Sequence, residues 1–475
     1  ESILSTRTRT KTIGRVRTGV DRQGRIVARE IRMLVDTGAY CTNGQVIPMA
    51  MGKKASRLYR IQDQTYEADA VYTNTPVAGA CRGYGTPQIC AVTEINVDHA
   101  ARALGMDPVE FRLKNLVHPY DADPAGGPSL GNARIRDCVL KGRELFGWQE
   151  KSRRPRGEGR FARGIGVACC THGNGYFGGF PDFITVDLRL TPGGAALLKG
   201  AFHDLGCGTV MSMMQIAAEV LGLEPEQVIV PDADTLVCPF DSAGTQASRV
   251  TFVCGGAVKA AAEQLKEKLL AGASALLGVP AADLRLDHGA VAGAGVRASY
   301  QEVVRHVQKM LKSDLSVNLL YQAPGNPASF GAHFAEVEVD RLTGRVRVVD
   351  YVAVHDVGRA INRGFVEGQI HGSVQMGIGM ALTEELTFDA RGRMLSSRFS
   401  RYTVPNAPEM PPVRVALIEE GEELGPFGAK SIGEIATVPV APAVINAVND
   451  ALGIRVSTLP ATPERVVAAI RAQTE

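Results

Sequence analysis

The chain has 475 residues, more than one ordinary hydrophobic core accommodates, so its length predicts two or more packed lobes. Its 52 basic and 50 acidic side chains nearly cancel, which argues against nucleic acid or an anionic membrane surface as the partner. The chain contains no run of 18 apolar residues of the kind that predicts a membrane span, and its first residues lack the apolar core of a signal peptide.

The nine cysteines are an odd number and contain no C-x-x-C pair, which argues against a disulfide scaffold. The chain also lacks the cysteine and histidine spacings of a structural zinc or iron–sulfur site. We therefore expect a cytoplasmic protein, either a processed subunit or part of a longer chain.

The first third of the chain alternates strand and helix patterns. Residues 13–40 alternate apolar and polar side chains around turn residues Asp21–Gly24, which predicts antiparallel strands. Residues 91–116 predict two helices, the second beginning at Asp107-Pro108, and the Pro- and Gly-rich residues 120–131 predict a loop. The basic run Lys151–Arg160 is either a domain boundary or a solvated linker. We place the boundary there, giving domains 1–150 and 151–475.

The rest of the chain mixes strands and helices without a regular β-α-β rhythm. The clearest hairpin covers Phe334–Val354, where apolar and acidic residues alternate on both sides of a Leu-Thr-Gly turn. The other predicted elements are a β-rich stretch over Gly164–Leu190, helices over Val210–Leu223, Ala257–Leu277, Gly364–Leu386 and Val440–Leu452, and a last helix that starts at Pro463. This order favours an α+β fold with mixed sheets and flanking helices.

Four Gly-rich segments stand out: Ala80–Gln88, Phe202–Thr209, Asp241–Arg249 and Gly368–Gly379. None continues into the G-K-[ST] of a phosphate-binding loop, and none is a convincing G-x-G-x-x-G dinucleotide motif. Each segment alone is explained as a turn or a close helix contact. Together they indicate bare backbone that approaches a large polar ligand, such as a phosphate or the edge of a pterin.

The segments RGYGTPQ, HDLGCGT, EVEVDRLTGRVRV, GQIHGSVQMGIG, GAKSIGEIA and LPATPERV follow one another in this order. In this arrangement the chain resembles the molybdopterin-binding region of the xanthine dehydrogenase family, over essentially its whole length. The resemblance implies a multi-lobed molybdopterin-binding α+β fold.

The resemblance implies that Glu434, in GAKSIGE, is the catalytic base that takes a proton as a water-derived oxygen attacks an electron-poor carbon. Partial burial by Ile432, Ile435 and Ala436 would raise its pKa toward the working pH. An isolated Gly-Glu pair would instead be a surface turn.

The resemblance also places Arg82 where the family orients a substrate carbonyl, and Tyr84 where an aromatic ring contacts the heterocycle. Tyr84 could alternatively be a core residue. Tyr176 or Phe177 would supply the second aromatic face. Lys430 would be either a charge partner of Glu434 or a solvated lysine.

The implied cofactor is molybdopterin, either as such or as its cytosine dinucleotide, with molybdenum held by the pterin dithiolene and by no side chain. Backbone N–H groups and hydroxyls are the expected donors to it. The matching positions are Gly83, Gly206, Cys207, Gly208, Thr245, Ala247, Ser248, Gln369 and Gly433.

Three features depart from the family pattern. Cys207 replaces a glutamine, and its thiol could fill space, contact the cofactor or be oxidised. Ala50 replaces a substrate-binding arginine, for which Lys53 or Lys54 could substitute. The upstream cofactor segment and the [2Fe-2S] and FAD modules are missing, so we expect them on a complementary molybdopterin subunit or upstream segment, an iron–sulfur subunit and an FAD subunit of a hetero-oligomer.

The function implied is hydroxylation of an N-heterocycle, a purine such as xanthine or hypoxanthine or else nicotinate, with water as oxygen source. One alternative is oxidation of an aldehyde or carbon monoxide, or reduction of an aromatic thioester. Another is a non-catalytic assembly subunit, against which the carboxylate at Glu434 argues.

Overall fold

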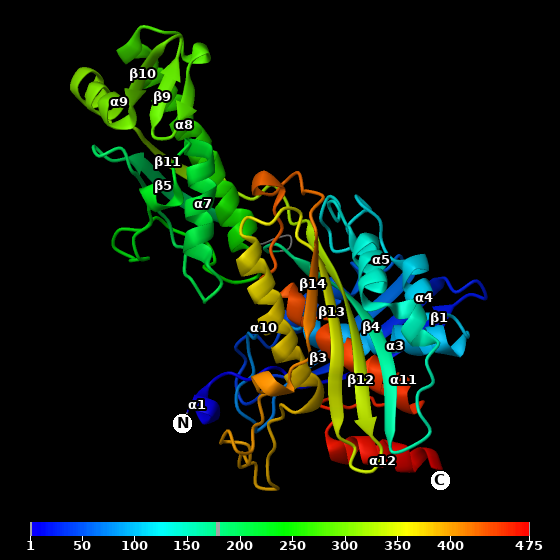
Figure 1. The fold of residues 1–475 in the computed structure, drawn as a ribbon. Coiled ribbons are helices and arrows are strands. Elements are labelled where there is room, and N and C mark those ends of the chain that lie inside the picture. The colour runs from blue at the N-terminus through cyan, green and yellow to red at the C-terminus, as the bar shows by residue number, and fades with distance from the viewer. Residues whose placement is uncertain (1, 177–180, 475) are drawn as a thin grey trace.

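A computed structural model describes residues 2–176 and 181–474 of the chain. Figure 1 shows a smaller lobe, built mainly from residues 183–322, attached to one end of a larger body. The lobe contains two sheets and the body contains two more. The α+β fold with several lobes is therefore confirmed.

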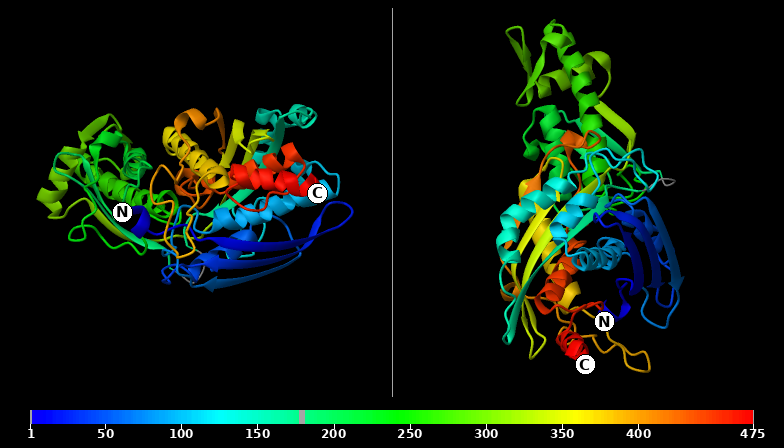
Figure 2. Two further views of the ribbon diagram at one scale, coloured as in Figure 1. Left: turned by 90° about the horizontal axis from the view of Figure 1, so that it is seen from below. Right: turned by 90° about the vertical axis from the view of Figure 1, so that its right-hand side faces the viewer.

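The N-terminal sheet forms one side of the body, with helices packed against its buried face (Figure 2). Its strands β1 and β2 are antiparallel and β3 joins β2 in parallel. Alternation along β2 buries Ile31, Met33 and Val35 against the helices, while the residues between them face outward. The elements here are α1 (Ser2–Ser5), β1 (Thr12–Val20), β2 (Ile26–Asp36), α2 (Val46–Ala55), β3 (Asp63–Val71) and α3 (Thr86–Ala103).

Helix α4 (Pro108–Asn115) starts where the sequence predicts, because the Asp107 side chain accepts hydrogen bonds from the N–H groups of Val109 and Glu110. The next helices are α5 (Ile135–Phe146) and α6 (Trp148–Ser152), and α5 packs against the central sheet. One apolar cluster contains residues from both sides of position 150, among them Phe146 and Phe334. A domain boundary at 150 stays a prediction.

The central sheet of the body has the strand order β14-β13-β12-β4. Its strands are β4 (Phe161–Gly173), β12 (Ala328–Asp340), β13 (Val346–Asp356) and β14 (Val413–Ile418), and the helices beside it are α10 (Arg363–Leu382), α11 (Val440–Leu452) and α12 (Pro463–Thr474). Glycine at 164 and 166 lets α11 lie directly on β4, because a Cβ at Gly166 would come within 2.2 Å of the Ala443 carbonyl oxygen. The segment Ile435–Leu452 is long and apolar enough to cross a membrane, but 94% of it is buried inside the protein.

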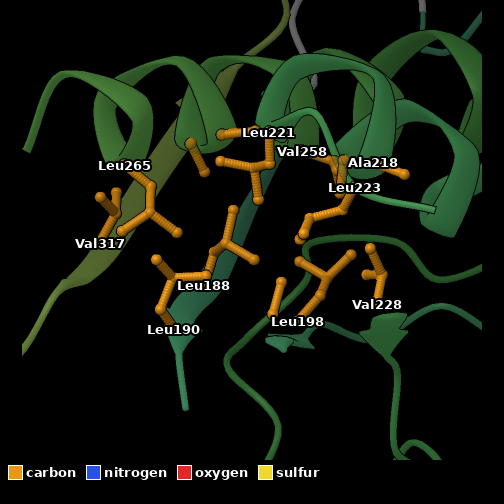
Figure 3. Packing of buried hydrophobic residues seen from close by; sticks show 14 of the residues in the cluster. Leu188, Leu190, Leu198, Ala218, Leu221, Leu223, Val228, Val258, Leu265 and Val317 are labelled. Carbon is orange, nitrogen blue, oxygen red and sulfur yellow. The ribbon is translucent and has the colours of Figure 1, made fainter. Parts of the chain in front are cut away.

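The smaller lobe has its own core between the sheet β11-β5-β6-β7 and helices α7 and α8 (Figure 3). Leu188 and Leu198 from the sheet meet Leu221 and Leu265 from the helices there, all fully buried. A three-stranded antiparallel sheet, β10-β9-β8, and helix α9 complete it. The bounds are β5 (Phe183–Leu190), β6 (Ala196–Lys199), α7 (Thr209–Leu221), β7 (Val228–Ile229), α8 (Gly255–Leu277), β8 (Arg285–Asp287), β9 (Ala290–Gly293), β10 (Val296–Ser299), α9 (Tyr300–His306) and β11 (Ser316–Gln322).

The strongest sequence patterns are found as elements of the predicted type. The hairpin around Asp21–Gly24, the hairpin Phe334–Val354 and the helix Val440–Leu452 are confirmed. The helix predicted over Gly364–Leu386 ends at Leu382, because the chain turns back through hydrogen bonds from Thr383 and Glu384 to Gly379.

Candidate active site

Glu434 lies where the body and the smaller lobe meet. Its Oε1 accepts a hydrogen bond of 3.0 Å from the Gly83 N–H, and its Oε2 accepts one of 2.8 Å from the Ser248 hydroxyl. The side chain is 15% exposed, so the carboxylate remains within reach of a ligand. Both oxygens therefore have donors of their own, and these hydrogen bonds favour the ionised form, whereas the burial of the side chain opposes it.

The turn that supplies the Gly83 N–H has three consecutive residues with positive φ: Gly83 at 93°, Tyr84 at 43° and Gly85 at 83°. Glycine is required at both ends of the three. A Cβ on Gly83 would come within 2.6 Å of Pro87, and one on Gly85 within 2.8 Å of Met51. The turn ends at the start of α3, which fixes the Gly83 N–H toward Glu434.

The loop that supplies the Ser248 hydroxyl is also strained. Ala247 and Ser248 have φ of 52° and 53°, a left-handed conformation that costs a residue with a Cβ about 1–2 kcal/mol. Arg249, buried directly after them, holds the loop by ion pairs to Asp182 and Asp241. Such strain persists only where the surroundings enforce it, and here it directs a hydroxyl at the carboxylate.

Behind the carboxylate lie a lysine and a histidine, both buried. Lys54 Nζ is 2.9 Å from His172 Nε2, and His172 Nε2 is 3.6 Å from Glu434 Oε2. Lys54 comes from α2 and His172 from the end of β4, so the group joins the N-terminal sheet region to the central sheet. Of the two lysines expected to replace the missing arginine at Ala50, Lys54 is the one near Glu434.

The electrostatics of the site differ from the sequence prediction. Burial raises the pKa of Glu434, but its interactions with His172 and Lys54 and the hydrogen bonds from Ser248 and Gly83 lower it by more, so the net pKa lies below its ordinary value. Burial and the nearby Lys54 lower the pKa of His172 to about 4. His172 is therefore neutral at pH 7, and the positive charge is on Lys54. The prediction of a raised pKa for Glu434 was wrong, because the effect of burial is outweighed by His172, Lys54 and two hydrogen bonds, all from residues distant in sequence.

Arg82 connects the residue before Glu434 to α10. Its Nε donates to the Gly433 carbonyl at 2.8 Å and its Nη2 donates to Gln369 Oε1 at 2.8 Å. The segment Gly428–Gly433 is also held at Ser431, whose N–H donates to Asn174 Oδ1 at 2.8 Å. Arg82 thus positions the residue before Glu434, and its contact with a substrate stays a prediction.

The Gly-rich loop of residues 202–209 is closed by its own acid. Asp204 Oδ1 accepts hydrogen bonds from the N–H groups of Gly206, Cys207 and Gly208 at 2.8, 2.9 and 3.2 Å. The sequence suggested that these amides are free to bind a ligand. They are instead hydrogen-bonded to Asp204 within the loop. Thr245 links the two Gly-rich loops of this lobe, because its hydroxyl donates to the His203 carbonyl at 2.8 Å.

Tyr84 and Tyr176 lie near each other. Burial raises the pKa of Tyr84, and the neighbouring Tyr176 phenol adds to that rise. Tyr176 is fixed through its backbone, whose N–H donates to Asp182 and whose carbonyl accepts from Asn326. Tyr84 also packs against the core of the N-terminal sheet, as the alternative interpretation expected. Phe177 lies outside the described residues.

Lys430 is not a partner of Glu434. Its buried ammonium donates to Asp356 Oδ2 and to the Asn132 carbonyl, both at 2.7 Å, and Glu422 lies 3.9 Å away. Neither of its sequence interpretations, a charge partner of the base or a solvated lysine, agrees with this. The ion pair fixes the chain four residues before Glu434, so its role is structural.

Sequence reasoning overlooked His172 and Asp204. A single histidine at the carboxyl end of an apolar strand, and an aspartate two residues before a Gly-x-Gly turn, were the available signals. Within the described residues, no group of three His, Cys, Asp or Glu side chains is arranged to hold a metal ion. The expectation that molybdenum is held by the pterin dithiolene and by no side chain stays a prediction.

Comparison with known proteins gives consistent matches. Residues 1–116 and 141–411 match two families described as molybdopterin cofactor-binding domains. The putative xanthine dehydrogenase molybdenum-binding subunit of Escherichia coli strain K12 is 34% identical, over 98% of this chain and 63% of its own length. A probable xanthine dehydrogenase subunit from Bacillus subtilis strain 168 is 30% identical, over 96% of this chain and 61% of its own length.

Among solved structures, quinoline 2-oxidoreductase from Pseudomonas putida 86 superposes with a TM-score of 0.88. It is 27% identical, and the match covers 98% of this chain and 63% of that one. The chain thus spans less than two thirds of the length of each of these relatives.

Proposed function

Because the chain belongs to the xanthine dehydrogenase family of molybdopterin-binding proteins, we propose that it carries the catalytic base of a molybdenum hydroxylase. The observation that supports this is the environment of Glu434. An ionised carboxylate with one donor for each oxygen, facing the junction of two lobes, is what a base at a closed site requires.

The residues around Glu434 fit a molybdopterin cofactor. A Cβ built on Gly206, Gly368 or Gly372 would meet no described atom within 4 Å, so backbone there faces open space. Polar groups stand beside that backbone, among them the Gln369 amide and the Cys207 thiol. Together with Gly83, Gly208, Thr245, Ala247, Ser248 and Gly433, these residues would line the cofactor. Because Asp204 already binds the N–H groups of residues 206–208, that loop would approach the cofactor closely rather than donate these hydrogen bonds to its phosphate.

When bound, the molybdenum cofactor supplies the oxidising centre of the reaction. Overall, a substrate C–H group and one water become a C–OH group, two electrons and two protons. Glu434 would accept one of these protons at its carboxylate. Arg82 would hold the Gly433 backbone so that this carboxylate keeps its direction.

The substrate class that we propose is an electron-poor N-heterocycle. The relatives named for xanthine and quinoline act on such rings, and Tyr84 with Tyr176 provides two aromatic side chains near the site. A xanthine-like or nicotinate-like substrate fits this pair better than a small aldehyde does. An ionised carboxylate with dedicated donors also argues against a non-catalytic assembly role.

The remaining parts of the enzyme belong to the proposal as well. A complementary molybdopterin segment, a [2Fe-2S] subunit and an FAD subunit would complete the site and carry the electrons away, in a cytoplasmic hetero-oligomer. The cytosine dinucleotide form of the cofactor also stays a prediction.

The test is to purify the native complex that contains this chain, measure its molybdenum and pterin, and assay a substrate panel. We expect about one molybdenum per chain and turnover of xanthine, hypoxanthine or nicotinate, with ¹⁸O from labelled water entering the product. A complex without molybdenum would contradict the proposal. Turnover of only aldehydes or carbon monoxide would contradict the substrate class.

A further inference from the structure

Lys54 contacts the candidate base through a histidine whose tautomer can be assigned. His172 Nδ1 is 2.9 Å from the Gly173 carbonyl oxygen, which can only accept, so Nδ1 carries the proton of the neutral ring. Nε2 is then an acceptor, and Lys54 Nζ donates to it at 2.9 Å. A second donation from Lys54, at 3.4 Å, goes to the carbonyl of Gly83, whose N–H binds Glu434.

Among the described residues, the cations whose charge acts on Glu434 include Lys54 and Arg82. Arg82 acts on Glu434 electrostatically, but its Nε and Nη2 are bound to Gly433 and Gln369. Arg57, next to Lys54 on the other side, forms a buried ion pair with Asp123. The Cys207 thiol also lies near Arg82.

Lys54 can stay charged although it is only 5% exposed. It lines a cavity of about 20 Å³ with Arg29, Thr86 and Thr171, each of which has a buried polar atom without a hydrogen-bond partner. That volume admits one water molecule, which would give the ammonium a third acceptor. Burial lowers the pKa of Lys54 to about 8, so the ammonium form still predominates at pH 7.

We propose that Lys54 is a positioning residue that acts through His172 and the Gly83 backbone to keep Glu434 ionised and correctly placed. This inference rests on the proposed function of Glu434 as the base. Loss of the cation leaves the carboxylate buried with only two hydrogen-bond donors. A nearby opposite charge typically changes the pKa of a carboxyl group by about 1–3 units. Without Lys54 the pKa of Glu434 therefore rises.

The variant to test is Lys54→Met in the intact complex, with pH profiles of kcat and kcat/KM and with molybdenum content. The acid limb of the profile should move up by about 1–3 pH units, while KM at high pH and the molybdenum content stay close to wild type. A readout that does not depend on turnover is the infrared carboxylate band of Glu434, obtained by difference against Glu434→Gln. Its titration midpoint should move by the same amount.

Lys151→Met is the matched control, because Lys151 is also largely buried and pairs with Glu336 and Asp350. It should lower stability but leave the acid limb unchanged. If Lys54→Met does not assemble, Lys54→Gln removes the same charge and retains a donor for His172. A wild-type acid limb and infrared midpoint in the variant that assembles would overturn the inference.

The two proposals fail in different ways. If Glu434→Gln turns over normally, the assignment of the base is wrong, whatever Lys54 does. If Glu434→Gln is inactive and removal of Lys54 leaves the titration of Glu434 unchanged, only the role of Lys54 is wrong.

Discussion

The Ser248 hydroxyl donates a hydrogen bond of 2.8 Å to Glu434 Oε2, joining two loops that are 186 residues apart in sequence. The donor belongs to the smaller lobe and the acceptor to the body, so the contact also joins the two parts of the fold. Ser248 reaches the carboxylate from a left-handed backbone conformation, with φ of 53°. The smaller lobe therefore takes part directly in setting the charge state of the candidate base.

Ser248→Ala should raise the pKa of Glu434 and lower kcat near its acid limb. A hydrogen bond to a charged group contributes about 1.5–3 kcal/mol, so a shift of about 1–2 pH units is expected. Ser248→Gly is the matched control for the backbone, because glycine relieves the left-handed strain while it removes the same hydroxyl. The pH profiles of both variants should therefore shift alike, while Ser248→Gly gives the higher Tm. A shift seen in only one of them would assign the effect to the backbone.

Glu434→Gln should reduce kcat by about 10²–10⁴ and leave cofactor content unchanged. Glutamine can still accept the Gly83 N–H through its oxygen and meet Ser248 with its amide, so the loop should keep its shape. Kinetic assays with molybdenum analysis of the same preparation provide the measurement. Equal loss of molybdenum and activity would mean that the residue holds the cofactor site together rather than acting as a base.

Wild-type activity should persist well below neutral pH. Burial raises the pKa of Glu434, but its interactions with His172 and Lys54 and two hydrogen bonds lower it by more. Since the net pKa is depressed, the active carboxylate is lost only as pH falls through that low value. The same sign applies to folding, because the stability contributed by this group is present above its ordinary pKa and disappears at acid pH. An acid limb of kcat/KM near pH 6–7 that is absent in Glu434→Gln would contradict a depressed pKa for Glu434.

The local patterns were enough to predict most elements of the fold. The turn at Asp21–Gly24 and the cap at Asp107 depend on neighbouring residues, so the sequence reveals them directly. The order of the Gly-rich segments likewise indicated the family, while the role of Glu434 as the base stays a prediction.

The partners of Glu434 could not be predicted in the same way. Lys430 is four residues away in sequence, but the chain directs it to Asp356. Lys54 is 380 residues away, yet it lies behind the carboxylate and, with His172 and two hydrogen bonds, lowers the pKa of Glu434. Such contacts depend on how α2 and β4 pack, and no periodic pattern in the sequence records that.

Lys430→Met should destabilise the protein strongly. It leaves Asp356, which is 1% exposed, without its cation, and breaking a buried ion pair from one side costs about 3–5 kcal/mol. The double variant Lys430→Met with Asp356→Asn should recover part of that loss, since no uncompensated charge remains. Denaturant unfolding of both variants measures the difference. A double variant no more stable than the single one would show that the pair is not the source of the loss.

Arg82 and Gln369 should show coupled effects, because Arg82 Nη2 donates to Gln369 Oε1 while Arg82 Nε holds the Gly433 carbonyl. Arg82→Met removes both contacts, whereas Gln369→Ala removes one and leaves the hold on Gly433. We therefore expect Arg82→Met to lower kcat/KM more than Gln369→Ala does. A double-mutant cycle should give a coupling of about 0.5–3 kcal/mol, as is usual for residues in direct contact. Arg82→Lys should not restore activity, since one ammonium cannot bond both partners in the geometry of a guanidinium. Additive losses in the cycle would instead indicate that Arg82 acts through a substrate contact independent of Gln369.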